Sequence, residues 1–252
     1  MEQKLGRVPA FVILLASSAA AFFLRLNQLA AGMDETGRMV AGAGKGLFTW
    51  FCVAMAAVFA VYSFFLHPRK KYHAIAAEDN LTFCLTMAAA AAMVVGRVAT
   101  VFAMEQITDV LLATGGVVTA ICWVVVGLDR VRDRKVPAAL FMAPALIYAV
   151  ELICEFRFWS RDPQILDYCF ELLALISVMC ATFHLGGFCF DKGKRRMSVF
   201  FAFCGVFFSA ASMADGGFGD IMVHAAAILW LLANLIPLLR PARKRSREEE
   251  EA

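Results

Sequence analysis

The sequence predicts an all-α fold, a polytopic transmembrane bundle of about eight helices. Of its 252 residues, 61% are hydrophobic and only 18% are charged, whereas soluble domains carry about 45–50% apolar and about 25% charged residues. The apolar residues form blocks of about 18–23 residues, the length at which a helix crosses a hydrocarbon core about 30 Å thick. Segments such as AAAAAMVV at 88–95 lack the alternation of apolar and polar residues that is typical of membrane β-barrel strands.

Four helices are expected in the first half of the chain, at 8–29, 48–66, 81–103 and 108–128. The first block has a long apolar stretch that continues into Arg25 and lacks a small-x-small cleavage site. It should therefore remain as the first helix and not be removed as a signal peptide. The turn-rich residues 30–47 are too short to bury a core of their own.

Four more helices are expected in the second half, at 137–155, 166–186, 197–214 and 221–239. Short polar breaks separate them, which leaves no room for an extramembrane domain. We expect residues 1–240 to form a single transmembrane bundle, and the charged tail, 241–252, to be disordered in the cytoplasm.

A weak repeat of four plus four helices is also compatible with the pattern. Asp109 opens the fourth helix and Asp220 opens the eighth, and about twenty residues separate each acid from an arginine near the other end of its helix. The alternative is that the enrichment of lysine and arginine in cytoplasmic loops produces such spacing in any polytopic protein.

Lysine and arginine are distributed unevenly among the loops. Eighteen of the 24 basic residues lie at the two termini and in the second, fourth and sixth loops. Short cytoplasmic loops are enriched in these residues. We therefore expect the protein to lie in the cytoplasmic membrane of the cell, with both termini in the cytoplasm. The loops expected outside are 30–47, 156–165 and 215–220, and those expected inside are 67–80, 129–136 and 190–196. An even number of spans agrees with this orientation.

The composition also bears on partners and cofactors. The net charge of +3 is dispersed over loop ends, so we expect a lipid bilayer and no nucleic acid as partner. The eight cysteines show no Cys-x-x-Cys spacing, and no cofactor is expected. Cys154 and Cys169 flank the loop between the fifth and sixth helices and could be bridged on an oxidising face.

Carboxylates at membrane depth are the most informative residues. Glu151 and Glu155 lie one turn apart on the fifth helix, and Asp167 and Glu171 have the same spacing on the sixth. A short loop makes these helices antiparallel neighbours, so all four carboxylates are expected in the outer third of the membrane. Because an unpaired charge there costs at least a few kcal/mol, they predict a compensated site.

Four further ionisable residues are expected at the same level. Arg97 lies in the third helix and Arg25 near the outer end of the first, while Asp220 and His224 are one turn apart on the eighth. Together the eight residues predict an acidic vestibule that opens outward and binds a cation, a proton or an amine-bearing solute.

Two other interpretations remain open. In the first, Arg97 pairs with an acid of the fifth or sixth helix, Glu151 or Glu171, and the pair fixes helix packing. In the second, the cluster is a catalytic pocket. The sequence holds no His-Glu-x-x-His, Gly-x-Ser-x-Gly or phosphate-loop motif, so we expect no enzymatic activity. Our leading hypothesis is a transporter-like or solute-binding protein. The alternative is a non-catalytic membrane component that acts through partner helices.

Three features carry a resemblance to other proteins: compact loops, the turn Asp34-Glu35-Thr36-Gly37 after a first helix containing Arg25, and the segment Arg157-Phe158-Trp159. In these the chain resembles uncharacterised multi-pass membrane proteins of anaerobic Gram-positive bacteria. The resemblance implies a bacterial cytoplasmic membrane and implies no activity.

Overall fold

The computed structural model describes residues 7–32, 45–76, 79–102, 107–159 and 165–240, and in these ranges the fold is all-α with eight α-helices. The helices are α1 (Arg7–Gly32), α2 (Lys45–Phe64), α3 (Asn80–Phe102), α4 (Ile107–Val131), α5 (Ala139–Trp159), α6 (Ile165–Phe188), α7 (Arg195–Ser212) and α8 (Phe218–Leu238). The expected bounds agree with these to within four residues. The largest difference is at α5, which continues past Glu155 to Trp159.

Seven of the helices are long and apolar enough to cross a membrane; α7 is the described α-helix that falls outside this set. Its sequence begins with Arg195 and Arg196 and includes four serine or glycine residues after them. It can be less apolar because most of its side chains are buried against other helices and not exposed to lipid. At a rise of 1.5 Å per residue its 18 residues span about 27 Å, close to the thickness of the hydrocarbon core. The chain is a multi-pass integral membrane protein.

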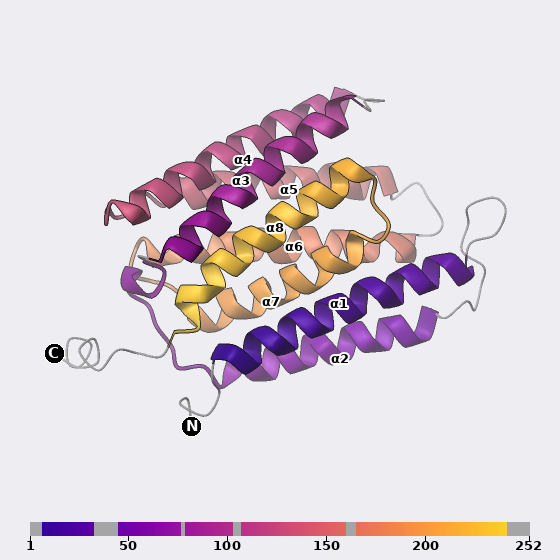
Figure 1. Ribbon diagram of the computed structural model, residues 1–252, viewed down its shortest axis with the longest axis horizontal. Coiled ribbons are helices and arrows are strands. Elements are labelled where there is room, and N and C mark those ends of the chain that lie inside the picture. Colours follow the sequence, from indigo (N-terminus) through magenta and orange to yellow (C-terminus); the bar gives the residue numbers. More distant parts are fainter. Residues whose placement is uncertain (1–6, 33–44, 77–78, 103–106, 160–164, 241–252) are drawn as a thin grey trace.

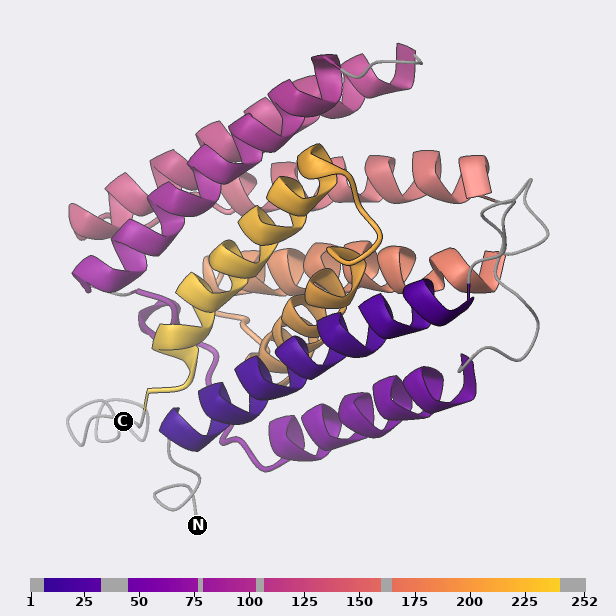
Figure 2. The same ribbon diagram turned by 45° about the vertical axis from the view of Figure 1, so that its right-hand side comes forward.

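Four of the described helices pack around α7 (Figure 1). Helices α6, α8, α1 and α2 all pack against α7, and α8 forms a second, more extensive interface with α3. Helix α4 packs on α3 and α5 and lies with α3 at one edge of the bundle, while α1 and α2 lie at the opposite edge (Figures 1 and 2).

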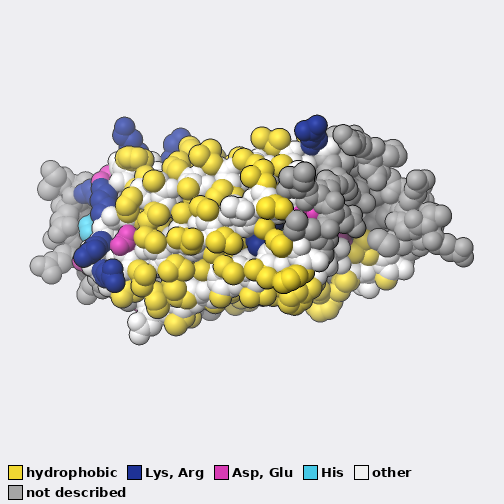
Figure 3. All heavy atoms as spheres, turned by 90° about the horizontal axis from the view of Figure 1, so that it is seen from above, with side chains coloured by type: hydrophobic (Ala, Val, Ile, Leu, Met, Phe, Trp, Pro, Cys, Tyr) yellow, Lys and Arg dark blue, Asp and Glu magenta, His cyan; other side chains and the backbone are white. Residues whose placement is uncertain are grey.

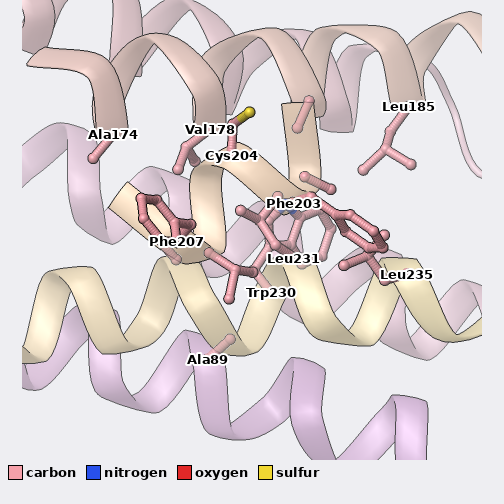
Figure 4. Close-up of a cluster of buried hydrophobic side chains, with 14 of the residues drawn as sticks. Ala89, Ala174, Val178, Leu185, Phe203, Cys204, Phe207, Trp230, Leu231 and Leu235 are labelled. Carbon is pink, nitrogen blue, oxygen red and sulfur yellow. The ribbon is translucent and has the colours of Figure 1, made fainter. Parts of the chain in front are cut away.

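The core contains large aromatic and aliphatic side chains from α3, α6, α7 and α8 (Figure 4). Trp230 is fully buried and stacks on Trp123, with ring centroids 4.8 Å apart and an interplanar angle of 10°. Gly205 of α7 lets α8 approach, because a Cβ there would lie 2.6 Å from Leu231 Cδ1. Close packing of this kind holds helices together where lipid removes the usual hydrophobic driving force.

The surface is divided along the long axis of the bundle (Figure 3). Hydrophobic side chains cover the middle, and lysine and arginine gather at the end where α1 begins and α8 ends. We call this the basic end; its exposed basic side chains include Lys70, Lys71, Arg132, Arg134, Lys135, Lys192, Lys194 and Arg196. The opposite end, where α1 ends and α6 begins, is called the acidic end.

Three connections are joined at the basic end around Tyr72. The Tyr72 hydroxyl donates to the carbonyl of Arg134 at 3.2 Å and accepts from the Val136 N–H at 3.1 Å. The Tyr72 N–H donates to the Asp191 carboxylate at 2.8 Å, and Lys135 donates to the same carboxylate at 3.1 Å. These two donors hold the pKa of the Asp191 carboxyl below its ordinary value. We call residues 66–76, 132–136 and 189–194 the basic cap.

The structure bears on several expectations besides the helices. The four-plus-four repeat is not visible in the packing of the described helices, because the extensive α3–α8 interface has no counterpart between α7 and α4. The acid-to-arginine spacing that suggested the repeat is accounted for by basic loops alone. Cys154 and Cys169 are thiols and not a disulfide. The turn at 34–37 and the tail, 241–252, lie outside the described residues.

Candidate functional site

A buried ion pair joins α3 to α5 near the acidic end. Arg97 Nη2 donates to Glu151 Oε1 at 2.5 Å, and both side chains are buried, with exposed fractions of 7% and 8%. The prediction that Arg97 pairs with an acid of the fifth or sixth helix is confirmed, and Glu151 is the partner. Because both charges are removed from water, each is needed to compensate the other.

Two glycines allow close contacts beside this pair. A Cβ on Gly116 of α4 would lie 2.4 Å from Arg97 Cγ, so the arginine side chain passes over the glycine surface. A Cβ on Gly96 of α3 would lie 2.8 Å from the Gly219 carbonyl oxygen of α8. The glycines therefore determine both the path of the Arg97 side chain and the separation of α3 from α8.

A second ion pair ties α1 to the connection between α7 and α8. Arg25 is 2% exposed; its Nε donates to Asp215 Oδ1 at 3.0 Å and its Nη2 donates to Asp215 Oδ2 at 2.5 Å. Its Nη1 donates to Gln28 Oε1 at 3.0 Å, and its guanidinium lies over the Phe170 ring at 5.3 Å. A two-point bond of this kind is strong and directional, so Arg25 anchors α1 and is committed to Asp215.

The role of Asp215 as the partner of Arg25 was not predicted from the sequence. The residue lies in the connection 215–220, which was expected at the same level as Arg25, but the chain separates the two residues by 190 positions. The available signal was an acid followed by two glycines at a helix end. Sequence spacing alone does not reveal that α7 packs against α1.

Glu171 of α6 is a carboxylate that takes part in neither of these two ion pairs. It is partly buried, and within the described part of the chain it forms no ion pair or hydrogen bond. Four acids lie within electrostatic range of it: Glu155, Asp220, Glu151 and Asp215. Arg97 and Arg25 are engaged by Glu151 and Asp215. We call Glu151, Glu155, Glu171, Asp215 and Asp220 the acidic cluster.

The predicted polar face of α8 has a partly structural role. Asp220 is exposed, and its carboxylate accepts from the Gly217 N–H at 3.2 Å, which caps the start of α8. His224, one turn further, is 6% exposed and lies within electrostatic range of Arg97. Tyr148 is 2% exposed beside the Arg97–Glu151 pair, and its hydroxyl has no hydrogen-bond partner among the described residues.

Seven of the eight predicted site residues can be placed. Glu151 and Arg97 form one pair, Arg25 belongs to another, and Glu155, Glu171, Asp220 and His224 lie nearby at the same end. Asp167 belongs to α6, but its side chain lies outside those that the structure describes. The expected gathering of charges is therefore observed at this end of the bundle, and Glu151 is the one of the predicted acids whose ion pair with a predicted arginine is seen among the described residues.

The arrangement of the cluster limits what it can bind. Among the described residues, no three or more His, Cys, Asp or Glu side chains come close enough to hold a metal ion. Divalent metals require several oxygen ligands at 2.0–2.6 Å.

Comparisons with protein-family models, with curated proteins and with solved structures found no match for this chain.

Proposed function

We propose that this membrane protein is transporter-like and binds a cation, a proton or an amine-bearing solute in an acidic vestibule at the acidic end of the bundle. The observation that supports the proposal is Glu171, a partly buried carboxylate at membrane depth whose described electrostatic neighbours are acids. A carboxylate in such surroundings is costly unless its charge is compensated. A bound proton or cation would compensate it.

The two ion pairs support this assignment by their stoichiometry. Arg25 is bonded to Asp215 and Arg97 to Glu151, and within the described residues neither arginine is bonded to Glu171. We infer that the five carboxylates of the acidic cluster give a negative potential at the end of the bundle that is expected to face outward. Such a potential concentrates cations and steers them to the site. Glu171 would be the residue that the solute contacts, and Glu151 and Asp215 would set the local charge.

The proposal predicts a ligand-dependent stability that Glu171 controls. In a thermal-shift screen of sodium, potassium, organic amines and amino acids, at least one ligand should stabilise the purified protein. A ligand at 100 times its Kd contributes about 2.7 kcal/mol. Glu171→Gln should abolish the shift while leaving the ligand-free protein at least as stable, because the substitution removes repulsion between like charges.

Asp133→Asn is the matched control for this experiment. Asp133 is exposed at the basic end and has a φ of 50°, which asparagine tolerates as well as aspartate does. The control should keep the full ligand response. If Glu171→Gln keeps it too, or if the variant is destabilised as expected for a broken structural contact, the proposed role of Glu171 is wrong.

The alternative function, a non-catalytic component that acts through partner helices, predicts no small ligand. The described helices expose many apolar side chains, but a lipid bilayer covers such surfaces as well as a partner helix does. No contact in the described part of the chain favours the partner helix. A screen without any stabilising ligand would favour this alternative.

The orientation in a cytoplasmic membrane is part of the proposal, with the basic end inside. In a variant whose eight native cysteines are replaced, Arg157→Cys should react with a membrane-impermeant maleimide in intact cells. Lys194→Cys should react only after the membrane is permeabilised. Both positions are exposed, so accessibility to the reagent depends on the side of the membrane. The reverse labelling pattern would invert the topology and place the acidic end inside.

A further inference from the structure

Arg130, at the basic end, is buried without a counter-charge. It lies in the last turn of α4 and is 5% exposed. Its Nη2 donates to Asn234 Oδ1 of α8 at 2.7 Å, while Nε and Nη1 are buried and have no hydrogen-bond partner. Within the described residues no acidic side chain forms an ion pair with it, and the nearby Asp191 is engaged by Lys135.

This differs from the arginines at the acidic end, each of which is bonded to a carboxylate. A neutral amide satisfies one hydrogen bond but does not neutralise the guanidinium. A desolvated charge without compensation is strongly destabilising. Arg130 therefore requires an anion that the described side chains do not supply.

Aromatic rings and buried donors lie around the Arg130 guanidinium. The guanidinium lies over the Phe141 ring at 5.8 Å, and Phe141 also contacts Trp230, with ring centroids 6.0 Å apart. The indole N–H groups of Trp230 and Trp123 are buried without partners as well. Asn234 directs its amide N–H to the Trp230 carbonyl at 2.8 Å. The buried polar atoms left unpaired in this group are thus all hydrogen-bond donors.

The guanidinium retains the geometry for a two-point bond. Nη2 carries two hydrogens and uses one on Asn234, so its second hydrogen and one on a neighbouring nitrogen form an edge with two donors. Such an edge matches two oxygens of a phosphate or carboxylate. Water could occupy the donors, but it would leave the positive charge uncompensated.

The position of Arg130 favours a phosphate. It is the penultimate residue of the candidate span Thr108–Val131, the level at which lipid headgroups meet the hydrocarbon core. Helix α4 is at the edge of the bundle, and Leu128 and Val131, two residues before and one residue after Arg130, are 37% and 61% exposed. The exposed lysines and arginines of the basic end would attract anionic groups to this level.

We propose that Arg130, with Asn234 and Phe141, forms a binding site for a phosphate oxyanion at the basic end of the membrane span. The oxyanion can come from the headgroup of an anionic lipid or from a free phosphate. Arg130 supplies the two-point bond, Asn234 holds the guanidinium in place, and the Phe141 ring supports its face. The site is separate from the acidic cluster and does not depend on the proposed function.

The test measures the thermal stability of the delipidated, full-length protein in a mild detergent. One arm adds phosphatidylglycerol and compares it with diacylglycerol, which lacks the phosphate. The other arm adds inorganic phosphate and compares it with chloride at equal ionic strength. A shift with phosphatidylglycerol alone assigns the site to a lipid headgroup, and a shift with inorganic phosphate shows that it accepts a free oxyanion. No shift with either ligand overturns the proposal.

Variants connect the shift to Arg130. Arg130→Gln should weaken binding at least about tenfold, whereas Arg132→Gln, which removes the same charge from an exposed position nearby, should bind almost as the wild type does. Equal loss in both variants would mean a diffuse electrostatic effect and would overturn the proposal. If Arg130→Gln does not fold, Arg130→Lys replaces it. This variant keeps the charge but lacks the two-donor edge, and an affinity equal to that of the wild type would likewise contradict the site.

Discussion

Replacing Arg97 by leucine should destabilise the folded protein by about 3–5 kcal/mol, the usual cost of leaving one member of a buried ion pair without its partner. Glu151 would then be a buried carboxylate with no cation bonded to it, since its described ion pair is with Arg97. The double variant Arg97→Leu with Glu151→Leu should recover most of this loss, because two apolar side chains can replace a buried pair at little cost. Unfolding in mixed micelles of a mild detergent and SDS measures the differences.

The acids of the same cluster provide the control for this rescue. Arg97→Leu combined with Glu171→Leu should recover much less stability than the double variant with Glu151→Leu, because Glu171 does not bond to Arg97 among the described contacts and its removal only relieves repulsion between like charges. Non-additivity is expected for residues in contact and not for residues without a shared bond. Equal rescue by both glutamates would mean that the arginine responds to the total charge at this end and has no specific partner.

Replacing Gly96 by alanine should cost about 1–3 kcal/mol, the usual penalty of overpacking a close interface. The added Cβ would lie 2.8 Å from the Gly219 carbonyl oxygen and 2.9 Å from the Val223 backbone nitrogen. Backbone atoms cannot rotate away as a flexible side chain can, so α3 and α8 must move apart. These two helices share the most extensive interface between described elements, and the movement would loosen many of its contacts.

Gly46→Ala is the matched control for this prediction. Gly46 is in the first turn of α2, and a Cβ added there has no atom within 4 Å. The same chemical change should leave the unfolding midpoint nearly unchanged or raise it, because alanine favours the helix more than glycine does. Equal destabilisation by the two substitutions would show that the cost comes from helix flexibility and not from the contact between α3 and α8.

The acidic end shows how far a sequence pattern can predict a site. The i, i+4 spacing of Glu151 with Glu155 and of Asp220 with His224 correctly indicated polar residues at one level of the bundle. It left open whether Arg97 pairs with Glu151 or Glu171, because both acids were expected at similar depth. It also offered no reason to connect Arg25 with Asp215, which the chain separates by 190 positions.

Arg130 and Asn234 illustrate a different limit. In the sequence Arg130 is one of several basic residues in a loop that the orientation rule already explains, and Asn234 is a single amide in an apolar helix. Their bond, together with the burial of the guanidinium, appears only when α4 and α8 are placed on either side of α3. A residue that serves topology by its charge can therefore also be buried as part of a site.

The sequence by itself determined the membrane-spanning class, the eight helices and the level of most charges along the membrane normal. These properties follow from the transfer of each segment between water and hydrocarbon, which depends on local composition and length. The tertiary structure decided which helices are neighbours, and hence that Glu151 bonds to Arg97, that Asp215 bonds to Arg25, and that Glu171 and Arg130 lack ion-pair partners in the described residues. These pairings depend on close contacts such as Gly96 with Gly219, and packing of this kind is set by the fit of surfaces far apart in the chain.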